Sequence, residues 1–209
     1  MDEKQAAGEG LRDRVLDAVL FNAAFDGWGP SGVRAAVRDG AITAGEAALA
    51  FPGGAPHMIE YHSLRADRRL VEELERRGVA SLKIRERITL AIRVRLEQNA
   101  AHREAIRRAL AILAMPLHAP LAARLLYRTV DAMWYATGDR SADFSFYTKR
   151  ATLSAVYSAT VLYWLNDRSE GSSATWAFLD RRIEDVMRFE KLKTQLREFG
   201  ERWRARPAR

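Results

Sequence analysis

The amino-acid sequence predicts an all-α fold of about nine or ten helices. Apolar residues recur at intervals of three and four along most of the chain, which is the spacing of one face of an α-helix. Glycine, proline and Asn-Asp pairs separate these segments, and no segment has a pattern typical of a strand. The 209 residues, of which 48% are hydrophobic, are enough to bury a core, so we expect one compact domain.

Three short helices are expected near the N-terminus, at Leu11–Phe25, Pro30–Arg38 and Thr43–Ala50. Residues 1–10, which precede them, are polar and acidic, so we expect this segment to be disordered. Asp39-Gly40 supplies a tight turn between the second and third helices. This order predicts a helix-turn-helix over residues 11–54, and it resembles the beginning of a TetR-type regulator.

Residues 55–188 are expected to form a larger helical bundle within the same compact domain. Amphipathic helices at Ala55–Arg77 and Ser81–Asn99 begin this bundle. The helix at Arg150–Leu165 is apolar or small on nearly every face, so we expect it to be central and buried. Its alanines and serines leave room beside the backbone, and this room either holds a ligand or lets neighbouring helices approach closely.

The C-terminal segment, residues 189–209, is basic and amphipathic. Of the formal net charge of +7, the stretch from Arg188 to Arg209 carries +5, from eight bases and three acids. An apolar seam flanked by bases is typical of a helix that lies flat on anionic lipid. We expect the membrane contact to be made by Lys191, Leu192, Lys193, Leu196, Phe199 and Trp203. A helix that docks on its own bundle or on a second subunit would show the same seam.

The sequence shows no targeting or membrane-spanning signal. The N-terminus, MDEKQAAGEG, has neither the apolar core of a secretory signal nor the arginines of a transit peptide. No apolar run approaches the ~18–20 residues that span a bilayer. The chain contains no cysteine, which excludes disulfides and thiolate metal sites. We therefore expect a cytoplasmic protein that is peripheral on the inner face of the cytoplasmic membrane.

The chain lacks the motifs of common enzymes. It contains no G-x-S-x-G, G-x-x-x-x-G-K or H-E-x-x-H sequence. Helical di-iron oxidases need two Glu-x-x-His pairs, and this chain has none. The spacing of the histidines suits no metal site, and we expect surface or capping positions for His57, His62, His102 and His118. Neither enzyme activity nor a metal is expected.

The most distinctive segment is Asp131–Arg150, which reads DAMWYATGDRSADFSFYTKR. Aromatic rings and charges flank a polar corner at Thr137–Asp143, where Gly138 suits a left-handed backbone. Aromatic residues beside arginines and acids are typical of protein interfaces. The pattern D-x-M-W-x-x-x-G-D-x-S-x-D-F-x-aromatic-Y-T-K/R-R resembles the lipid-binding accessory proteins of ubiquinone biosynthesis, the ninth family of the coenzyme Q set. The resemblance continues in the run ALAILAMPLHAP before this segment and through Tyr157 to Asp180 after it.

This resemblance implies a TetR-like fold and a role without catalysis. In that role the protein holds an isoprenoid ubiquinone precursor and presents it to a hydroxylase of the demethoxyubiquinone hydroxylase type, with no cofactor other than the bound lipid. The matching partner-binding positions are Met133, Trp134, Asp143, Phe146, Tyr147 and Arg150. The lipid is expected to contact Leu113, Leu153, Val156, Tyr157, Thr160 and Trp164. A homodimer is expected for this fold.

The alternative is a TetR-type transcription regulator with a lipid effector. Its recognition helix would be Thr43–Ala50, which has no Arg, Lys, Asn or Gln to read a base edge. Glu46 on this helix would face the phosphates with like charge. Arg34 and Arg38 on the preceding helix suit only phosphate contacts, which position a protein without specifying sequence. Specific binding of nucleic acid is therefore not expected.

Overall fold

The computed structural model describes residues 3–138 and 144–204, and the side chains of residues 8–138 and 147–188. In these parts the chain forms nine α-helices, four short 3₁₀ turns and no strand. The helices are α1 (Glu3–Asp26), α2 (Pro30–Arg38), α3 (Ala44–Ala50), α4 (Ala55–Arg77), α5 (Ile84–Glu97), α6 (Arg103–Leu113), α7 (Ala119–Ala136), α8 (Phe144–Asn166) and α9 (Ser173–Arg204). The 3₁₀ turns are η1 (Val79–Ser81), η2 (Ala100–His102), η3 (Pro116–His118) and η4 (Glu170–Ser172). The predicted all-α fold class is confirmed.

Several helix ends coincide with the predicted ones because strong local signals mark them. Pro30 opens α2, and Gly78 ends α4 with a left-handed φ of 63°. Thr43 caps α3, since its Oγ1 accepts a hydrogen bond from the Glu46 amide at 3.1 Å. In return, Glu46 Oε2 accepts one from the Thr43 amide at 2.8 Å. A capping box therefore sets the start of this short helix.

Two helix starts differ from the prediction. α1 begins at Glu3, so the expectation that residues 1–10 are disordered is wrong for residues 3–10. A run of good helix formers, Glu3–Ala7, extends the helix toward the N-terminus and outweighs the glycines that follow. α5 begins at Ile84 rather than Ser81, because Ser81 ends a 3₁₀ turn and the Glu86 carboxylate accepts from the Lys83 amide at 2.9 Å.

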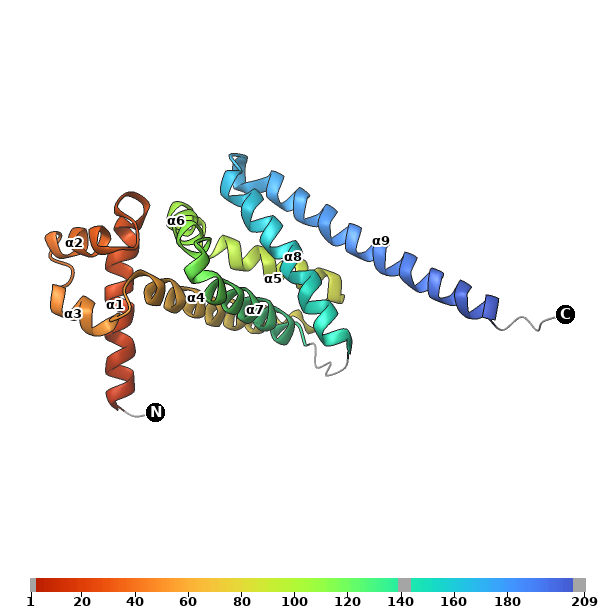
Figure 1. Ribbon diagram of the computed structural model, residues 1–209, viewed down its shortest axis with the longest axis horizontal. Coiled ribbons are helices and arrows are strands. Elements are labelled where there is room, and N and C mark those ends of the chain that lie inside the picture. The colour runs from red at the N-terminus through yellow and green to blue at the C-terminus, as the bar shows by residue number, and fades with distance from the viewer. Residues whose placement is uncertain (1–2, 139–143, 205–209) are drawn as a thin grey trace.

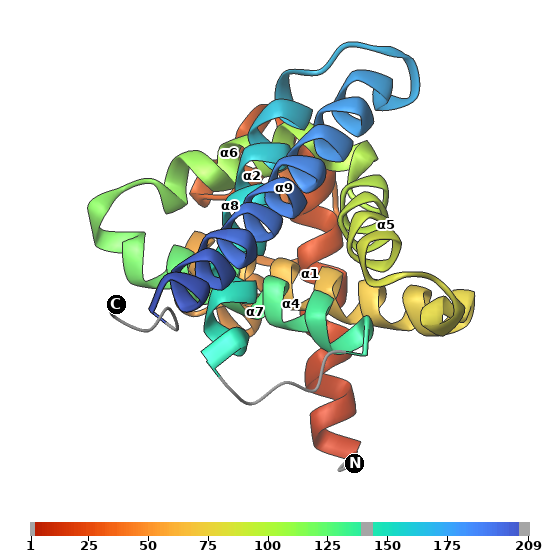
Figure 2. The ribbon, with the colours of Figure 1, turned by 90° about the vertical axis from the view of Figure 1, so that its right-hand side faces the viewer.

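The helices are arranged in two blocks that share α4. Figure 1 shows α1, α2 and α3 together at one end, with α4 leading from them into the remaining helices. α7 packs alongside α4, and α8 packs on α7. The view in Figure 2 shows α9 lying over α8, where the rings of Tyr163 and Phe178 stack with their centroids 4.5 Å apart.

Each block has its own buried apolar core. The first core joins α1, α2, α3, the beginning of α4, α6 and one turn of α7. The second joins the end of α4 to α5, α7, α8 and α9. Trp28, in the loop after α1, ties the first core to α6, since its buried indole Nε1 donates to the Ala105 carbonyl at 2.7 Å. The junction of the two cores therefore falls between α4, α6, α7 and α8.

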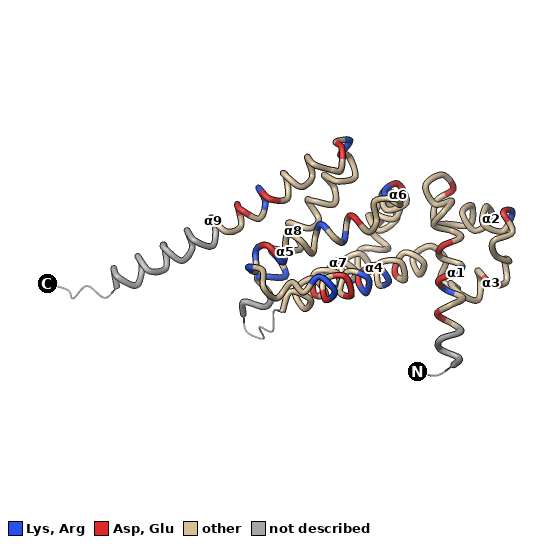
Figure 3. The backbone as a smooth tube through the Cα atoms, turned by 180° about the vertical axis from the view of Figure 1, so that it is seen from behind, with Lys and Arg blue, Asp and Glu red and all other residues tan. Residues whose placement is uncertain are grey.

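Ion pairs attach α4 to its neighbours on both sides. The buried Arg65 guanidinium contacts the carboxylates of Asp13 at 3.1 Å and Asp17 at 2.6 Å, both on α1. Glu60 contacts Arg124 at 3.1 Å and Arg128 at 3.2 Å, both on α7. Acidic and basic residues accordingly interleave along α4 and α7 in Figure 3. α4 is therefore fixed by its charges as well as by the apolar residues that it buries.

No single helix in the described parts has both the length and the apolar character needed to cross a membrane. One pair of helical segments, Ala100–Leu113 and Pro116–Ala136, satisfies both criteria when taken together, by length and composition alone. The chain bends by 95° between these two segments.

Candidate ligand pocket and partner surface

A largely apolar pocket of about 390 Å³ lies at the junction of the two cores. Five helices, α4 to α8, contribute to its lining. Its main apolar wall residues are Ile59, Ile106, Leu110, Leu113, Leu125, Leu126, Val161 and Trp164. Ala114 and Leu162 also line it and are exposed, so the pocket reaches the surface between the α6–α7 corner and α8. Cavities of roughly 300–1,000 Å³ with apolar walls and few polar groups are typical of small-molecule sites.

Three of the six residues predicted to contact lipid line this pocket: Leu113, Tyr157 and Trp164. The other three, Leu153, Val156 and Thr160, are buried but do not line this pocket. Leu153 and Val156 pack in the second core, and the Thr160 hydroxyl donates to the Val156 carbonyl at 2.7 Å. Direct lipid contact by these three stays a prediction. α8 is apolar on both faces, so its sequence alone does not indicate which face lines a pocket.

A buried ion pair lies beside the pocket. Arg95 of α5 donates from Nε to Asp67 Oδ1 of α4 at 3.0 Å, and both side chains are less than a tenth exposed. The Thr129 hydroxyl of α7 lies 3.0 Å from both oxygens of the same carboxylate. Burial raises the pKa of Asp67, while Arg95 and Thr129 act in the opposite direction. The Asn99 amide holds the Arg95 backbone by donating to its carbonyl at 2.7 Å.

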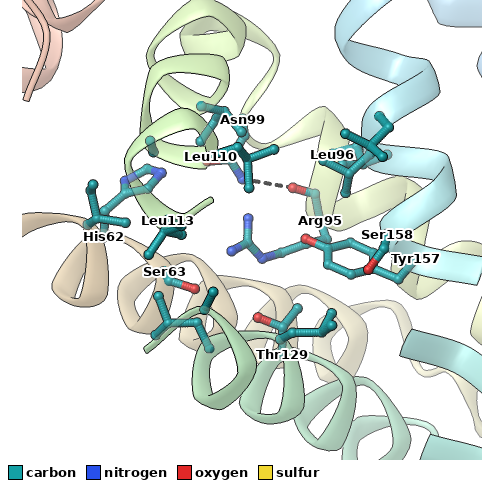
Figure 4. Close-up of a pocket in the computed structure, with 18 of the residues that line it drawn as sticks. His62, Ser63, Arg95, Leu96, Asn99, Leu110, Leu113, Thr129, Tyr157 and Ser158 are labelled. Carbon is teal, nitrogen blue, oxygen red and sulfur yellow. Dashed lines mark hydrogen bonds between the residues drawn. The ribbon is translucent and has the colours of Figure 1, made fainter. Parts of the chain in front are cut away.

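Figure 4 shows the Arg95 guanidinium in the middle of the pocket, with the Tyr157 hydroxyl directed toward it. Burial raises the pKa of Tyr157 above its ordinary value, so its hydroxyl stays protonated at neutral pH. The pocket thus has apolar walls and a small polar group of side chains in its interior.

His62 of α4 also lines the pocket, and its imidazole has no hydrogen-bond partner among the described residues. The expectation of a surface or capping position is wrong for this histidine, which is 7% exposed. Burial and, to a smaller extent, the cations Arg95 and Arg65 together lower the pKa of His62 to about 3. The ring is therefore neutral at physiological pH. His57, by contrast, is exposed and accepts a hydrogen bond from the Gly53 amide at 3.1 Å.

The predicted partner-binding residues differ in exposure. Tyr147 is 70% exposed, whereas Met133 is fully buried in the second core, so a direct contact between Met133 and a partner is wrong. Arg150 is also buried, and its Nε donates to Asp131 Oδ1 at 2.7 Å, so it fixes α8 against α7 instead of facing outward. Trp134 is half-buried, with the Lys149 ammonium 5.6 Å from the centre of its ring.

Several predicted positions lie outside the described residues. They are Asp143, the side chain of Phe146, and the side chains of the proposed membrane contact, Lys191, Leu192, Lys193, Leu196, Phe199 and Trp203. In the described part of the corner after α7, Gly138 has a φ of 86°, as its predicted left-handed backbone requires.

Known proteins resemble this chain in the helices that form the pocket. A family model described as COQ9 matches residues 119–190, which run from the start of α7 into α9. A ubiquinone biosynthesis protein COQ9, mitochondrial, of Drosophila melanogaster is 32% identical over 93% of this chain. The corresponding protein of Homo sapiens is 31% identical over 96% of this chain. The chain belongs to the COQ9 family. It spans 60% and 65% of the length of these two relatives.

A solved structure supports the fold of this COQ9-family chain. The crystal structure of a TetR transcriptional regulator from Nitrosomonas europaea superposes with a TM-score of 0.69 and 27% sequence identity. The match covers 84% of this chain and 97% of that one. The predicted TetR-like fold is therefore confirmed.

Proposed function

We propose that this COQ9-family chain acts in ubiquinone biosynthesis as a non-catalytic lipid-binding protein. In this proposal it holds an isoprenoid ubiquinone precursor in the pocket between α4 and α8 and presents it to a hydroxylase of the demethoxyubiquinone hydroxylase type. The observation that carries the proposal is the apolar pocket of about 390 Å³. An apolar cavity of about 150 Å³ holds benzene, so this one has room for a ring and a short piece of tail. The remaining tail would leave between Ala114 and Leu162.

Presentation of the lipid needs a partner surface and a membrane contact. The exposed Tyr147 and the Trp134 ring, which contacts the Lys149 ammonium, support a partner surface near the junction of α7 and α8. The basic segment at residues 189–209 supports contact with an anionic membrane, on which the protein would be peripheral. A homodimer is part of the same proposal.

The proposal is tested by extracting freshly purified full-length protein with organic solvent and identifying the lipid. Native mass spectrometry of the same sample gives the ratio of lipid to protein and the number of subunits. We expect a quinone-like or other isoprenoid lipid in a near-stoichiometric amount. Protein that folds normally and carries no such lipid would remove the main support for the carrier role.

Filling the pocket should displace the lipid. Ala122 of α7 lines the pocket, so Ala122→Trp is expected to abolish lipid retention while costing ~1–3 kcal/mol of stability through overpacking. Ala123→Trp is the matched control, because Ala123 is the next residue of the same helix and is exposed. Lipid per protein is measured by native mass spectrometry and stability by urea unfolding. Equal lipid content in the two variants would contradict the assignment of this pocket.

A second candidate function, transcription regulation with a lipid effector, is favoured by the likeness to a TetR regulator. The composition of α3 opposes it, because Glu46 is the only charged residue of this helix and is already engaged in capping it and in pairing with Arg14. We expect equal, weak binding to all duplexes, lost as salt rises from about 50 to 200 mM. Electrophoretic mobility shifts with promoter-derived and random duplexes check this, and a salt-resistant preference for one duplex would support the regulator instead.

A further inference from the structure

The interior of the pocket contains hydrogen-bonding groups that the rest of the described chain does not use. Arg95 donates to Asp67 through Nε only, and its two terminal nitrogens have no partner among the residues described. The Tyr157 hydroxyl, also without a partner there, points toward the same place in Figure 4. Leaving such groups unpaired in an apolar interior is unfavourable, so a ligand atom that pairs with them gains binding energy.

The buried cations around these groups are each matched by carboxylate charge. Arg95 is matched by Asp67 at 3.0 Å, and Arg65, the next buried cation, is matched by Asp13 and Asp17. His62, which lies on the α4 side of the pocket, is neutral because burial lowers its pKa to about 3. An anionic head group would therefore bring an uncompensated charge into a low-dielectric site, which is strongly unfavourable. A neutral oxygen acceptor brings no such charge.

We propose that Arg95 and Tyr157 bind oxygen atoms on the neutral ring of the lipid, such as a quinone carbonyl or a phenol oxygen, and disfavour carboxylate and phosphate head groups. This inference rests on the proposed function, in which the pocket holds an isoprenoid lipid. Arg95 donates two or more N–H groups from a fixed plane, and the Tyr157 hydroxyl donates or accepts. The ring then lies between α5 and α8, and the tail runs along Leu110 and Leu113 toward the mouth.

Three probes of different head chemistry test the proposal on lipid-free full-length protein. They are a ubiquinone analogue with a short isoprenoid tail, an isoprenoid hydrocarbon of similar length without a ring, and oleate. For the wild type we expect the quinone to bind about tenfold or more tightly than either of the others, as one or two hydrogen bonds to a charged donor provide. Affinities are measured by isothermal titration calorimetry.

Two conservative variants identify the residues responsible. Tyr157→Phe removes only the hydroxyl, and Arg95→Lys keeps the charge opposite Asp67 while removing the planar fork. Each is expected to weaken quinone binding about five- to tenfold and to leave the hydrocarbon unchanged. Tyr163→Phe is the matched control, because Tyr163 is on the same helix, is 38% exposed and does not line the pocket.

Each other outcome overturns the inference in a distinct way. If hydrocarbon and quinone bind equally and both variants behave as the wild type, the pocket holds isoprenoid tails without reading the ring, and the proposed function stands. If oleate binds more tightly than the quinone, the site selects an anion. If no isoprenoid binds at all, the proposed function fails and this inference fails with it.

Discussion

Asp67→Ala is expected to destabilise the fold by ~3–5 kcal/mol, because it leaves the Arg95 guanidinium buried without its counterion. The side chains of this pair are 8% and 9% exposed, so little solvent is available to replace the lost carboxylate. The Thr129 hydroxyl loses its acceptor in the same step. Urea unfolding followed by circular dichroism measures the lost stability. The comparison holds when the free energy of unfolding depends on urea concentration with the same slope in the variant and the wild type.

Two controls separate the buried charge from ordinary ion pairing. Glu104→Ala removes the exposed pair with Arg107, which also has a separation of 3.0 Å, and should cost about 1 kcal/mol or less. The double variant Asp67→Ala/Arg95→Met removes both buried charges, so it should be more stable than Asp67→Ala alone. A loss of less than about 1 kcal/mol in Asp67→Ala would mean that water reaches Arg95 and that the pocket is wetter than its apolar walls indicate.

The fold could be predicted well because its signals are local. Pro30, Thr43 and Gly78 mark helix ends through backbone geometry and capping, which depend on a few neighbouring residues. The glycine-rich N-terminus was harder, since Gly8 and Gly10 suggest a break where α1 continues. Helix propensity is a weak preference, and the packing of the rest of α1 is sufficient to override it.

The candidate site could be predicted only in part because a pocket depends on the spacing between helices. Leu113 and Tyr157 were found, but Leu110 and Leu125 line the same pocket and have sequence patterns no different from core residues. Periodicity indicates which face of a helix is apolar, and both a core and an apolar pocket satisfy it equally. The family resemblance gives no further help, because it does not indicate which residues of α8 pack in the second core and which line the pocket.

The buried ion pairs beside the pocket could not be predicted from the sequence for a different reason. Arg65 and Asp67 stand in α4 among arginines and acids of an exposed face, such as Arg68 and Arg69, and nothing in that sequence separates the buried members from the exposed ones. Their burial follows from partners on other helices, namely Asp13 and Asp17 on α1 and Arg95 on α5. Long-range pairing of this kind is a property of the tertiary fold.

The stability of the chain is expected to fall as the pH is lowered from about 6.5 toward 3, because His62 is buried as the neutral form. Its pKa is about 3 in the folded state, against 6.5 for an unperturbed histidine. Between these values the unfolded chain binds a proton that the folded chain does not, so acid favours unfolding. One such group contributes roughly 1.4 kcal/mol per pH unit, and on the order of 4 kcal/mol over the whole window.

His62→Phe should remove this decrease of stability with falling pH. It keeps a ring of similar size against Trp28, whose ring centroid lies 5.5 Å from that of His62. Urea midpoints at about pH 7 and about pH 5 measure the effect. Both pH values lie above the range in which the titration of carboxyl groups dominates the change in stability. His118→Gln, at the corner between α6 and α7, is the control and should keep the wild-type slope. His62→Phe should be at least as stable as the wild type near neutral pH, because it no longer buries an imidazole without a hydrogen-bond partner among the described residues. A wild-type slope in His62→Phe would show that the imidazole is already hydrated in the folded state, and the dry pocket on which the choice of a neutral ligand depends would then be wrong.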